Sequence, residues 1–154
     1  AAARSFRTAF ADGGVDPSRL ELLDGLPDKR DHLNLYGRLH LALDTFPYNG
    51  TTTTCEALWM GVPVVTLRGS MHAGRVGASL LTAAGMSDLI ADSTDSFVSL
   101  ASALAQDPDR LAKARAKALG FRASPLCDAA AFAPRFETAL RTMWRDWCSR
   151  AASR

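Results

Sequence analysis

Four consecutive threonines and a nearby carboxylate are the residues of this 154-residue chain whose types and spacing best suit ligand chemistry. They are Thr51 to Thr54 and Glu56, and they follow Asn49-Gly50, a dipeptide typical of turns. Threonine is a poor residue for a helix interior but a good cap, because its hydroxyl accepts bonds from free backbone N–H groups. A helix start carries unpaired N–H groups and a partial positive charge, which together suit phosphate. The segment therefore predicts an anion site at a helix start.

The neighbouring segments must position this helix start. Residues 41–44 end an apolar run that predicts a short buried strand, and Val64-Val65-Thr66-Leu67 predicts the next one. Between them, Thr53 and Glu56 have the spacing of a capping box, and Gly61 is expected to end the helix. The order of strand, turn, helix and strand places the anion site at the carboxyl end of a parallel sheet. Turn chemistry explains most of these residues without a ligand, so the residues alone leave both interpretations open.

A second candidate pair lies at the start of a helix predicted from Lys29 to Leu39, with Asp28 as its N-cap. Lys29 and His32 are three residues apart, so they share a face in the first turn. They could point at an anionic or aromatic ligand, or they could form an exposed charged turn with the neighbouring aspartates. The spacing alone favours the exposed turn.

Three basic residues form a third candidate group. Arg68, His72 and Arg75 follow the strand that ends at Leu67, where open α/β sheets bind their ligands. A single histidine in a loop is usually solvated, so this group carries little weight alone.

The rest of the chain predicts strands and helices in alternation, which is typical of an α/β fold with a parallel sheet and right-handed crossovers. Short strands are expected at 20–23 and 89–91, and helices at 1–11, 74–84, 94–106, 111–119 and from 128–134 onward. The last helix carries apolar residues at helical spacing, which must pack on another surface. These residues are Phe132, Phe136, Leu140, Met143, Trp144 and Trp147.

The composition bounds the classes of function. A formal net charge of +2 is too small to indicate a nucleic-acid or anionic-membrane partner. No apolar run approaches the roughly 20 residues of a membrane span. The three cysteines are odd in number and far apart, which indicates neither a disulfide framework nor a zinc site and fits a reducing compartment. We therefore expect a cytoplasmic protein with no metal site, no membrane contact and no nucleic-acid partner.

The central stretch resembles the C-terminal catalytic lobe of the O-linked N-acetylglucosamine transferase and SPINDLY family. The resemblance covers the chain from about Leu20 onward. The sequence at 46–56 is similar to that of the bacterial members, which usually carry tetratricopeptide repeats. The segments that carry it are Asp44-Thr45, 49–53, 56–66, 75–80, Ser124-Pro125-Leu126 and Met143-Trp144.

The resemblance implies a GT-B glycosyltransferase, with two Rossmann-like lobes and the nucleotide-sugar in the C-terminal one. Residues 1–154 would then be a fragment, the nucleotide-sugar-binding lobe without its N-terminal strands, with 128–150 as a long terminal crossover helix. The implied function is the donor half of an inverting protein O-glycosyltransferase that acts on Ser/Thr, with UDP-GlcNAc as the favoured donor. One alternative is a GDP-fucose-dependent O-fucosyltransferase on the same scaffold. The other is a non-catalytic protein-interaction module.

The resemblance also implies roles for single residues. Lys29 would contact the diphosphate, His32 the nucleoside, and Leu26-Pro27-Asp28 the base through its backbone. Thr51, Thr52 and Thr53, following Asn49 and Gly50, would hold the diphosphate, and Glu56 would hold the ribose. The animal enzyme has histidine in place of Thr51, aspartate in place of Glu56 and an arginine near Leu35, which bears on base and sugar preference. No catalytic residue is identified in this fragment, and no cofactor is implied.

The implied partners are a nucleotide-sugar donor, a protein acceptor, an N-terminal catalytic lobe and tetratricopeptide repeats. In a doubly wound sheet of order 3-2-1-4-5-6, two strands would be absent between the strands expected at 20–23 and 41–44. We therefore expect the isolated chain to be poorly stable, prone to association and inactive.

Overall fold

The computed structural model describes residues 2–23 and 25–152, which divide into two compact units, Ala1–His32 and Leu33–Arg154. The first unit holds helix α1 (Ala2–Asp12) and a 3-10 turn at Pro17–Arg19. The Arg7 guanidinium donates to the Pro17 carbonyl at 3.2 Å and ties the two together. The strand expected at 20–23 is wrong, because this segment is irregular. A strand needs a partner for its backbone groups, and no described segment pairs with it.

The second unit is built on a parallel sheet of three strands in the order β1-β2-β3. The strands are β1 (Ala42–Leu43), β2 (Val64–Leu67) and β3 (Ile90–Ala91). Ala42 is opposite Val64, and Thr66 is opposite Ile90. In the described part of the chain β1 has no neighbour on its outer edge, and Leu43 is 57% exposed. The parallel arrangement confirms the fold class expected from the alternation of strands and helices.

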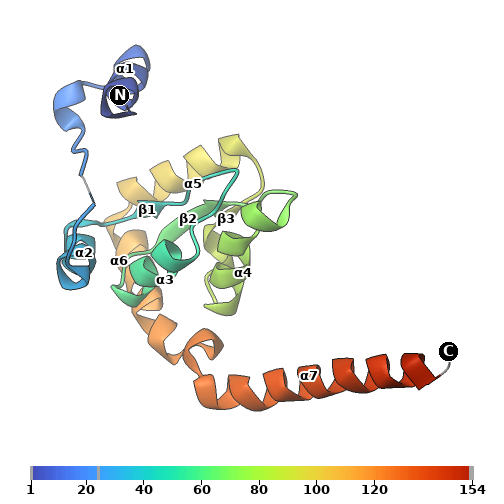
Figure 1. Cartoon of the computed structure of the whole chain (residues 1–154). Helices are drawn as coiled ribbons and strands as arrows, with labels where there is room; N and C mark the ends of the chain where they lie inside the picture. The colour runs from blue at the N-terminus through green and yellow to red at the C-terminus, as the bar shows by residue number, and fades with distance from the viewer. Residues whose placement is uncertain (1, 24, 153–154) are drawn as a thin grey trace. The chain divides into compact units, whose positions relative to one another are not determined.

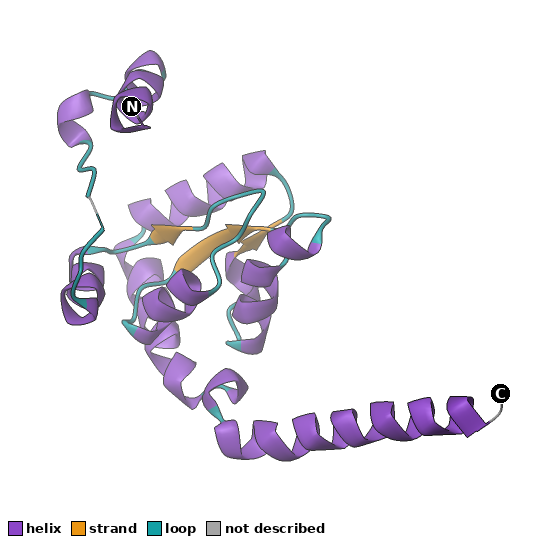
Figure 2. Cartoon of the chain, in the orientation of Figure 1, coloured by secondary structure: helices purple, strands orange, loops and turns teal. Residues whose placement is uncertain are grey.

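Helices cover both faces of the sheet (Figures 1 and 2). The helices after α1 are α2 (Lys29–Leu35), α3 (Thr52–Trp59), α4 (Val76–Ala83), α5 (Thr94–Gln106), α6 (Pro108–Leu119) and α7 (Ala129–Ala152), and α7 runs away from the sheet. The crossover helices α3 and α4 lie on one face and α5 on the other, as right-handed connections between successive parallel strands require. The carboxyl ends of β1 and β2 therefore meet at one edge, where the turns before α3 and α4 lie.

The core lies between the sheet and these helices. Its fully buried side chains include Leu58, Val62, Val65, Leu81, Met86 and Leu104. Ser93 caps α5 through its side chain, and Asp107 caps α6 ahead of Pro108. Gly61 has a φ of 76° just after α3, so it ends that helix as predicted.

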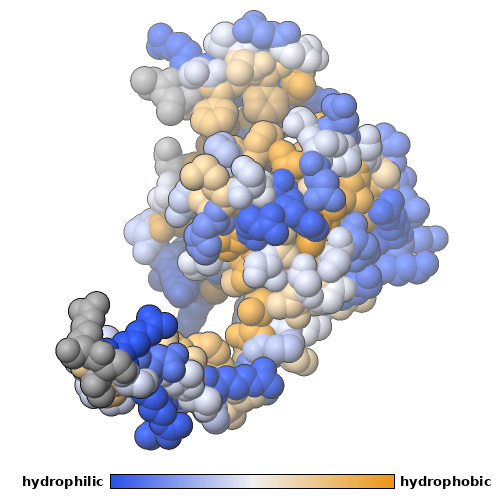
Figure 3. Space-filling view, turned by 90° about the vertical axis from the view of Figure 1, so that its right-hand side faces the viewer, coloured by the Kyte–Doolittle hydropathy of each residue, from blue (hydrophilic) through white to orange (hydrophobic). Residues whose placement is uncertain are grey.

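Helix α7 is a single helix with Pro134 inside it. Its apolar residues are exposed rather than packed, and Phe132 stacks on Phe136 while Trp144 stacks on Trp147. The face drawn in Figure 3 likewise exposes apolar surface among charged residues. The expectation that this stripe needs another surface is consistent with its exposure.

Candidate functional site

The start of α3 lacks a side-chain cap. Its N-cap is Thr51, which has αR backbone angles, and no side-chain hydrogen bond to the first turn is present among the described residues. The predicted capping box between Thr53 and Glu56 is therefore wrong, because α3 begins at Thr52 and Thr53 lies inside the helix rather than at its N-cap. A capping threonine also needs an extended backbone to direct its hydroxyl at the following N–H groups, and Thr51, the residue at the N-cap, lacks that conformation. Thr51, Thr52 and Thr53 are exposed, so the first turn of α3 presents N–H groups and hydroxyls to solvent.

Gly50 allows the chain to enter α3 tightly. A Cβ at this position would collide with the Thr53 hydroxyl and lie 3.2 Å from that of Thr54. Any other residue would therefore push the threonine side chains out of place. The sequence pattern indicated a turn here, and the structure adds a steric reason for glycine.

Asp44 stabilises the turn at Asn49-Gly50 by a hydrogen bond. It follows β1, is 8% exposed, and its Oδ1 accepts a hydrogen bond from the Gly50 N–H at 2.8 Å. Its Oδ2 accepts one from the Thr66 hydroxyl at 2.7 Å. The Gly50 amide is thereby turned inward, and the three threonines that follow it are exposed. Thr66, fully buried in β2, was not singled out from the sequence.

Asn49 joins the two loops at the edge of the sheet. It is 1% exposed, and its Nδ2 donates to the Thr45 carbonyl at 2.8 Å. Its Oδ1 accepts from the Gly77 N–H at 3.3 Å, and its own N–H donates to the Ala73 carbonyl at 2.9 Å. The Asn49 side chain is thus engaged within the protein, and it fixes the turn before α3 against the turn before α4.

Tyr36 supports α3 from the side of β1. Its side chain is 9% exposed, and its hydroxyl donates to the Thr53 carbonyl at 3.3 Å. Burial raises the pKa of Tyr36, and the charge of Glu56 and a hydrogen bond with it raise that pKa further. Tyr36 therefore contacts both the first turn of α3, through the Thr53 carbonyl, and the carboxylate of Glu56. Its spacing of four from His32 was visible in the sequence, but its contact with α3 was not.

Lys29, His32 and Pro27 belong to the first compact unit, whereas 49–56 belong to the second. Lys29 begins α2 and is exposed, and His32 is half-buried one turn later. The predicted cap is confirmed, because Asp28 Oδ1 accepts from the N–H of Arg30 at 2.7 Å. Lys29 is therefore the first residue of α2, as the sequence predicted.

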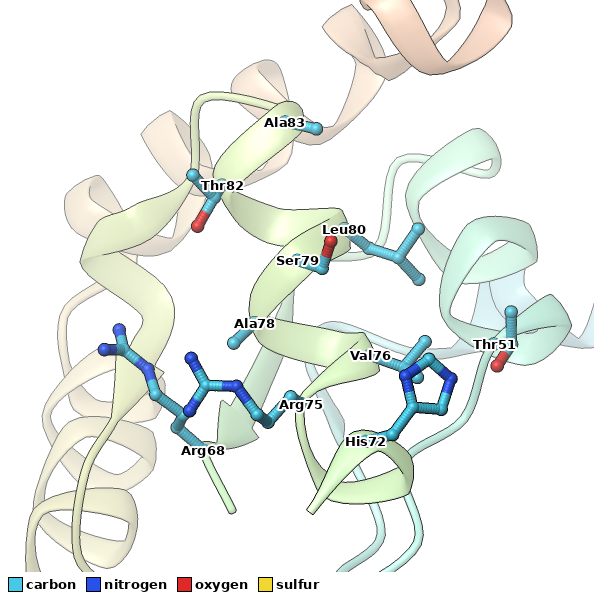
Figure 4. A pocket seen from close by; sticks show the side chains of 10 residues that line it. All are labelled: Thr51, Arg68, His72, Arg75, Val76, Ala78, Ser79, Leu80, Thr82 and Ala83. Carbon is cyan, nitrogen blue, oxygen red and sulfur yellow. The ribbon is translucent and has the colours of Figure 1, made fainter. Parts of the chain in front are cut away.

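A cleft of about 860 Å³ adjoins Thr51 on the side of β2. Figure 4 shows its lining, with the Arg68 and Arg75 side chains at one end and the His72 ring toward Thr51. The lining residues are Thr51, Arg68, His72, Arg75, Val76, Ala78, Ser79, Leu80, Thr82 and Ala83. None of them is acidic. Arg68 Nε lies 3.3 Å from Asp92 Oδ1, and Arg75 donates to the Gly69 carbonyl at 3.3 Å.

Within residues 2–23 and 25–152, no cluster of three or more His, Cys, Asp or Glu residues is arranged to hold a metal ion. No helix in the described part has both the length and the apolar character that crossing a membrane requires.

Comparison with known proteins gives consistent matches. Glycosyl transferase family 41 matches residues 3–136. A rice protein named as a probable UDP-N-acetylglucosamine–peptide N-acetylglucosaminyltransferase SPINDLY is 46% identical over 146 residues, which cover 94% of this chain and 16% of the rice protein. A Caenorhabditis elegans UDP-N-acetylglucosamine–peptide N-acetylglucosaminyltransferase is 36% identical over 142 residues, covering 92% of this chain and 12% of that protein.

A solved structure is also similar. The K341M mutant of the Thermobaculum terrenum O-GlcNAc transferase superimposes with a TM-score of 0.90 at 41% identity, over 97% of this chain and 29% of that chain. The three-stranded sheet, its helices and the long α7 thus have the arrangement of a catalytic lobe of GT-B type. The chain spans less than a fifth of the length of the rice and worm relatives.

Proposed function

Because the chain belongs to glycosyl transferase family 41, we propose that it is the donor-binding lobe of an inverting protein O-glycosyltransferase that uses UDP-GlcNAc and acts on serine or threonine. The names of the rice and worm relatives and of the Thermobaculum structure support this donor and a peptide acceptor. An N-terminal catalytic lobe and tetratricopeptide repeats complete the proposed whole protein. The length of the relatives beyond the matched part agrees with that proposal.

One observation carries the proposal, namely the uncapped start of α3 at the carboxyl edge of the sheet. The N–H groups and hydroxyls of Thr51, Thr52 and Thr53 face solvent there, and the buried Asp44 anchors the turn that precedes them. A helix start that does not cap itself is well suited to accept an external anion. The diphosphate of a nucleotide-sugar is such an anion.

The remaining roles follow from the chemistry of each side chain. Lys29 is proposed to neutralise the diphosphate, His32 to contact the nucleoside and the backbone around Pro27 to meet the base. Glu56, fixed by Tyr36, is proposed to accept hydrogen bonds from the ribose hydroxyls. Asn49 and Gly50 act by shaping the turn, since the Asn49 side chain and the Gly50 amide are engaged within the protein.

Transfer with inversion releases the nucleoside diphosphate with growing negative charge. Backbone N–H groups at a helix start, threonine hydroxyls and one lysine can stabilise that charge, because they are fixed before the reaction begins. These groups supply the stabilisation that divalent cations supply in other transferases, so the proposal invokes no metal ion.

Isothermal calorimetry on the full-length protein tests the donor assignment. We expect UDP and UDP-GlcNAc to bind, and GDP and GDP-fucose to bind at least about tenfold more weakly, a difference of roughly 1.4 kcal/mol. Transfer of GlcNAc to a serine- or threonine-containing peptide is the matching activity assay. Tighter binding of GDP-fucose would instead identify an O-fucosyltransferase, and no binding of any nucleotide would refute a donor-binding lobe.

A further inference from the structure

The basic cleft beside α3 has two ends of different character. At one end lies Thr51, at the start of α3, with the His72 ring directed toward it, and at the other end lie Arg68 and Arg75 (Figure 4). Arg68 directly follows β2 and Arg75 directly precedes α4, and both are exposed. This arginine end, Arg68 and Arg75, has no part in the donor contacts proposed above.

The positive charge of the arginine end is only partly balanced. Arg68 Nε lies 3.3 Å from Asp92 Oδ1, and the Asp92 side chain is itself 73% exposed. Arg75 donates one N–H to the Gly69 carbonyl at 3.3 Å and pairs with no acidic residue in the described part of the chain. A guanidinium has five N–H donors and stays charged, so most donors of the two arginines remain available. One carboxylate therefore faces two guanidinium groups, and no described acidic residue lines the cleft.

Backbone hydrogen bonds fix the segment that carries the two arginines. The Arg68 N–H donates to the Ala91 carbonyl of β3 at 2.8 Å. The Gly69 N–H donates to the Gly74 carbonyl at 2.6 Å, and the side chain of Arg75 bonds back to Gly69 across the same loop. The two charges are therefore held in place before any ligand arrives, which lowers the entropy cost of binding.

The arginine end lies along the path that an acceptor polypeptide must take. The acceptor hydroxyl has to approach the sugar bonded to the diphosphate at 51–53, so the residues that flank it pass over the same edge of the sheet. An extended chain advances about 3.3 Å per residue. The cleft of about 860 Å³ begins at Thr51 and is lined by Val76, Ala78 and Leu80, which supply apolar surface for such a segment.

We propose that Arg68 and Arg75 bind an acidic side chain of the protein acceptor, a few residues from its acceptor serine or threonine. The forked donors of a guanidinium match the two oxygens of a carboxylate. Charges exposed at the rim of a site contribute mainly to the choice of partner, so the arginine end would select acceptors by their charge. This inference rests on the proposed function and gives the arginine end a role separate from donor binding.

The test compares acceptor peptides in GlcNAc transfer by the full-length protein. A set of serine peptides carries a single aspartate that is moved one position at a time along each side of the serine, and each has a matched peptide with asparagine instead. We expect kcat/KM to favour the aspartate peptide about fivefold at the best position, or roughly 1 kcal/mol, as for an exposed ion pair. The preference should shrink at an ionic strength of about 0.5 M, because salt screens exposed charges.

Three variants connect this preference to the arginine end. Arg75→Ala should reduce the ratio of the two kcat/KM values to within about twofold of unity, and Arg75→Glu should reverse it, so that a lysine peptide becomes the better acceptor. Asp92→Asn removes the carboxylate that competes for Arg68 and should increase the preference for aspartate. Calorimetry should show UDP affinity within about twofold of the native value in all three.

Arg110→Ala is the matched control, because Arg110 is an exposed arginine on α6 outside the cleft, and it should leave the preference unchanged. Transfer without any preference for aspartate, or a preference that survives both Arg75 substitutions, would overturn this inference alone. A large loss of UDP affinity in the Arg75 variants would assign the arginines to the donor phosphates and overturn it as well. Absence of transfer to every peptide, together with absence of UDP binding, would instead refute the proposed function.

Discussion

The carboxylate of Asp44 and the hydroxyl of Thr66 are joined by a hydrogen bond of 2.7 Å inside the protein, across two neighbouring strands. The same carboxylate accepts from the Gly50 amide, so one buried charge links the end of β1, the middle of β2 and the turn before α3. A buried carboxylate is tolerated only when its hydrogen bonds are made. The turn that begins the proposed diphosphate site is therefore coupled to the core of the sheet.

Removal of this carboxylate should be costly. Asp44→Ala leaves the Thr66 hydroxyl and the Gly50 N–H without their partner, which we expect to lower the free energy of unfolding by about 2–4 kcal/mol. Asp44→Asn can keep both contacts if the Thr66 hydroxyl accepts from the new amide, so it should lose less than half as much. Urea unfolding followed by circular dichroism measures both. Equal stability of the alanine variant and the native protein would show that the contact contributes nothing.

Gly77 should not tolerate a side chain. A Cβ there would collide with Asp44 Oδ2 and with the Thr66 hydroxyl, which are both buried. Gly77→Ala should therefore destabilise the domain by about 2 kcal/mol or more through overpacking. Gly120→Ala is the control, since no atom lies within 4 Å of a Cβ there and the backbone is αR. Thermal unfolding of the two variants should differ clearly, and similar melting temperatures would contradict the packing.

Tyr36 should make stability sensitive to alkaline pH. Its pKa in the folded protein lies above the ordinary value of 10.0, mainly because of burial and then because of Glu56. The folded state therefore retains the proton of the Tyr36 hydroxyl more strongly than the unfolded state does. The contribution of protonated Tyr36 to stability is complete below pH 10, the ordinary pKa, and is lost as pH rises through the raised pKa. Tyr36→Phe should flatten this fall in unfolding measurements between pH 9 and about 11.5.

The other tyrosine of the chain provides the comparison for Tyr36. Tyr48 is 72% exposed, so Tyr48→Phe should leave the alkaline fall in stability unchanged. If both phenylalanine variants followed the native curve, another group would be responsible for the loss of stability.

The threonines at the start of α3 should matter for nucleotide binding more than for folding. The double substitution Thr52→Val and Thr53→Val removes two exposed hydroxyls, and we expect a loss of roughly 1–3 kcal/mol in UDP binding. Calorimetry measures this loss, and circular dichroism checks that the helix remains. Thr142→Val, at an exposed position of α7 outside the cleft, is a control for the change of residue type. Undiminished affinity in the double variant would refute diphosphate binding at α3.

Lys29 and His32 should affect different steps if they contact different parts of the donor. Lys29→Ala should lower turnover strongly, because the lysine is proposed to stabilise charge on the leaving diphosphate. His32→Ala should mainly weaken nucleotide binding. Steady-state kinetics of GlcNAc transfer, with kcat and KM determined separately, distinguishes the two effects. Small and equal effects would support the alternative in which both residues form a solvated turn.

Local sequence patterns were sufficient for the elements around the candidate site. The turn at Asn49-Gly50, the helix after it and the end of that helix at Gly61 were all predicted from turn and cap chemistry. The strand before the turn and the one after it were also found, although β1 is shorter than expected. These features depend on residues that are neighbours in the sequence, so a local pattern contains the information.

The errors and omissions have a common physical origin in partners that are distant in the sequence. Residues 20–23 have the composition of a strand, but a strand also needs a neighbour to pair with. Thr53 and Glu56 have the spacing of a capping box, yet Tyr36 contacts both, and it lies 17 residues before Thr53. The bond between Asp44 and Thr66 spans 22 residues. No local pattern reveals such contacts.

The exposed aromatic face of α7 allows its burial to be followed by intrinsic tryptophan fluorescence. Two of the protein's three tryptophans, Trp144 and Trp147, stack on each other there with 64% and 62% of their surface exposed. The third, Trp59, lies under the Arg122 guanidinium at 4.7 Å and belongs to the folded body of the lobe. Intrinsic fluorescence should therefore be dominated by α7, and a blue shift of the emission would record its burial against a partner surface without any added label.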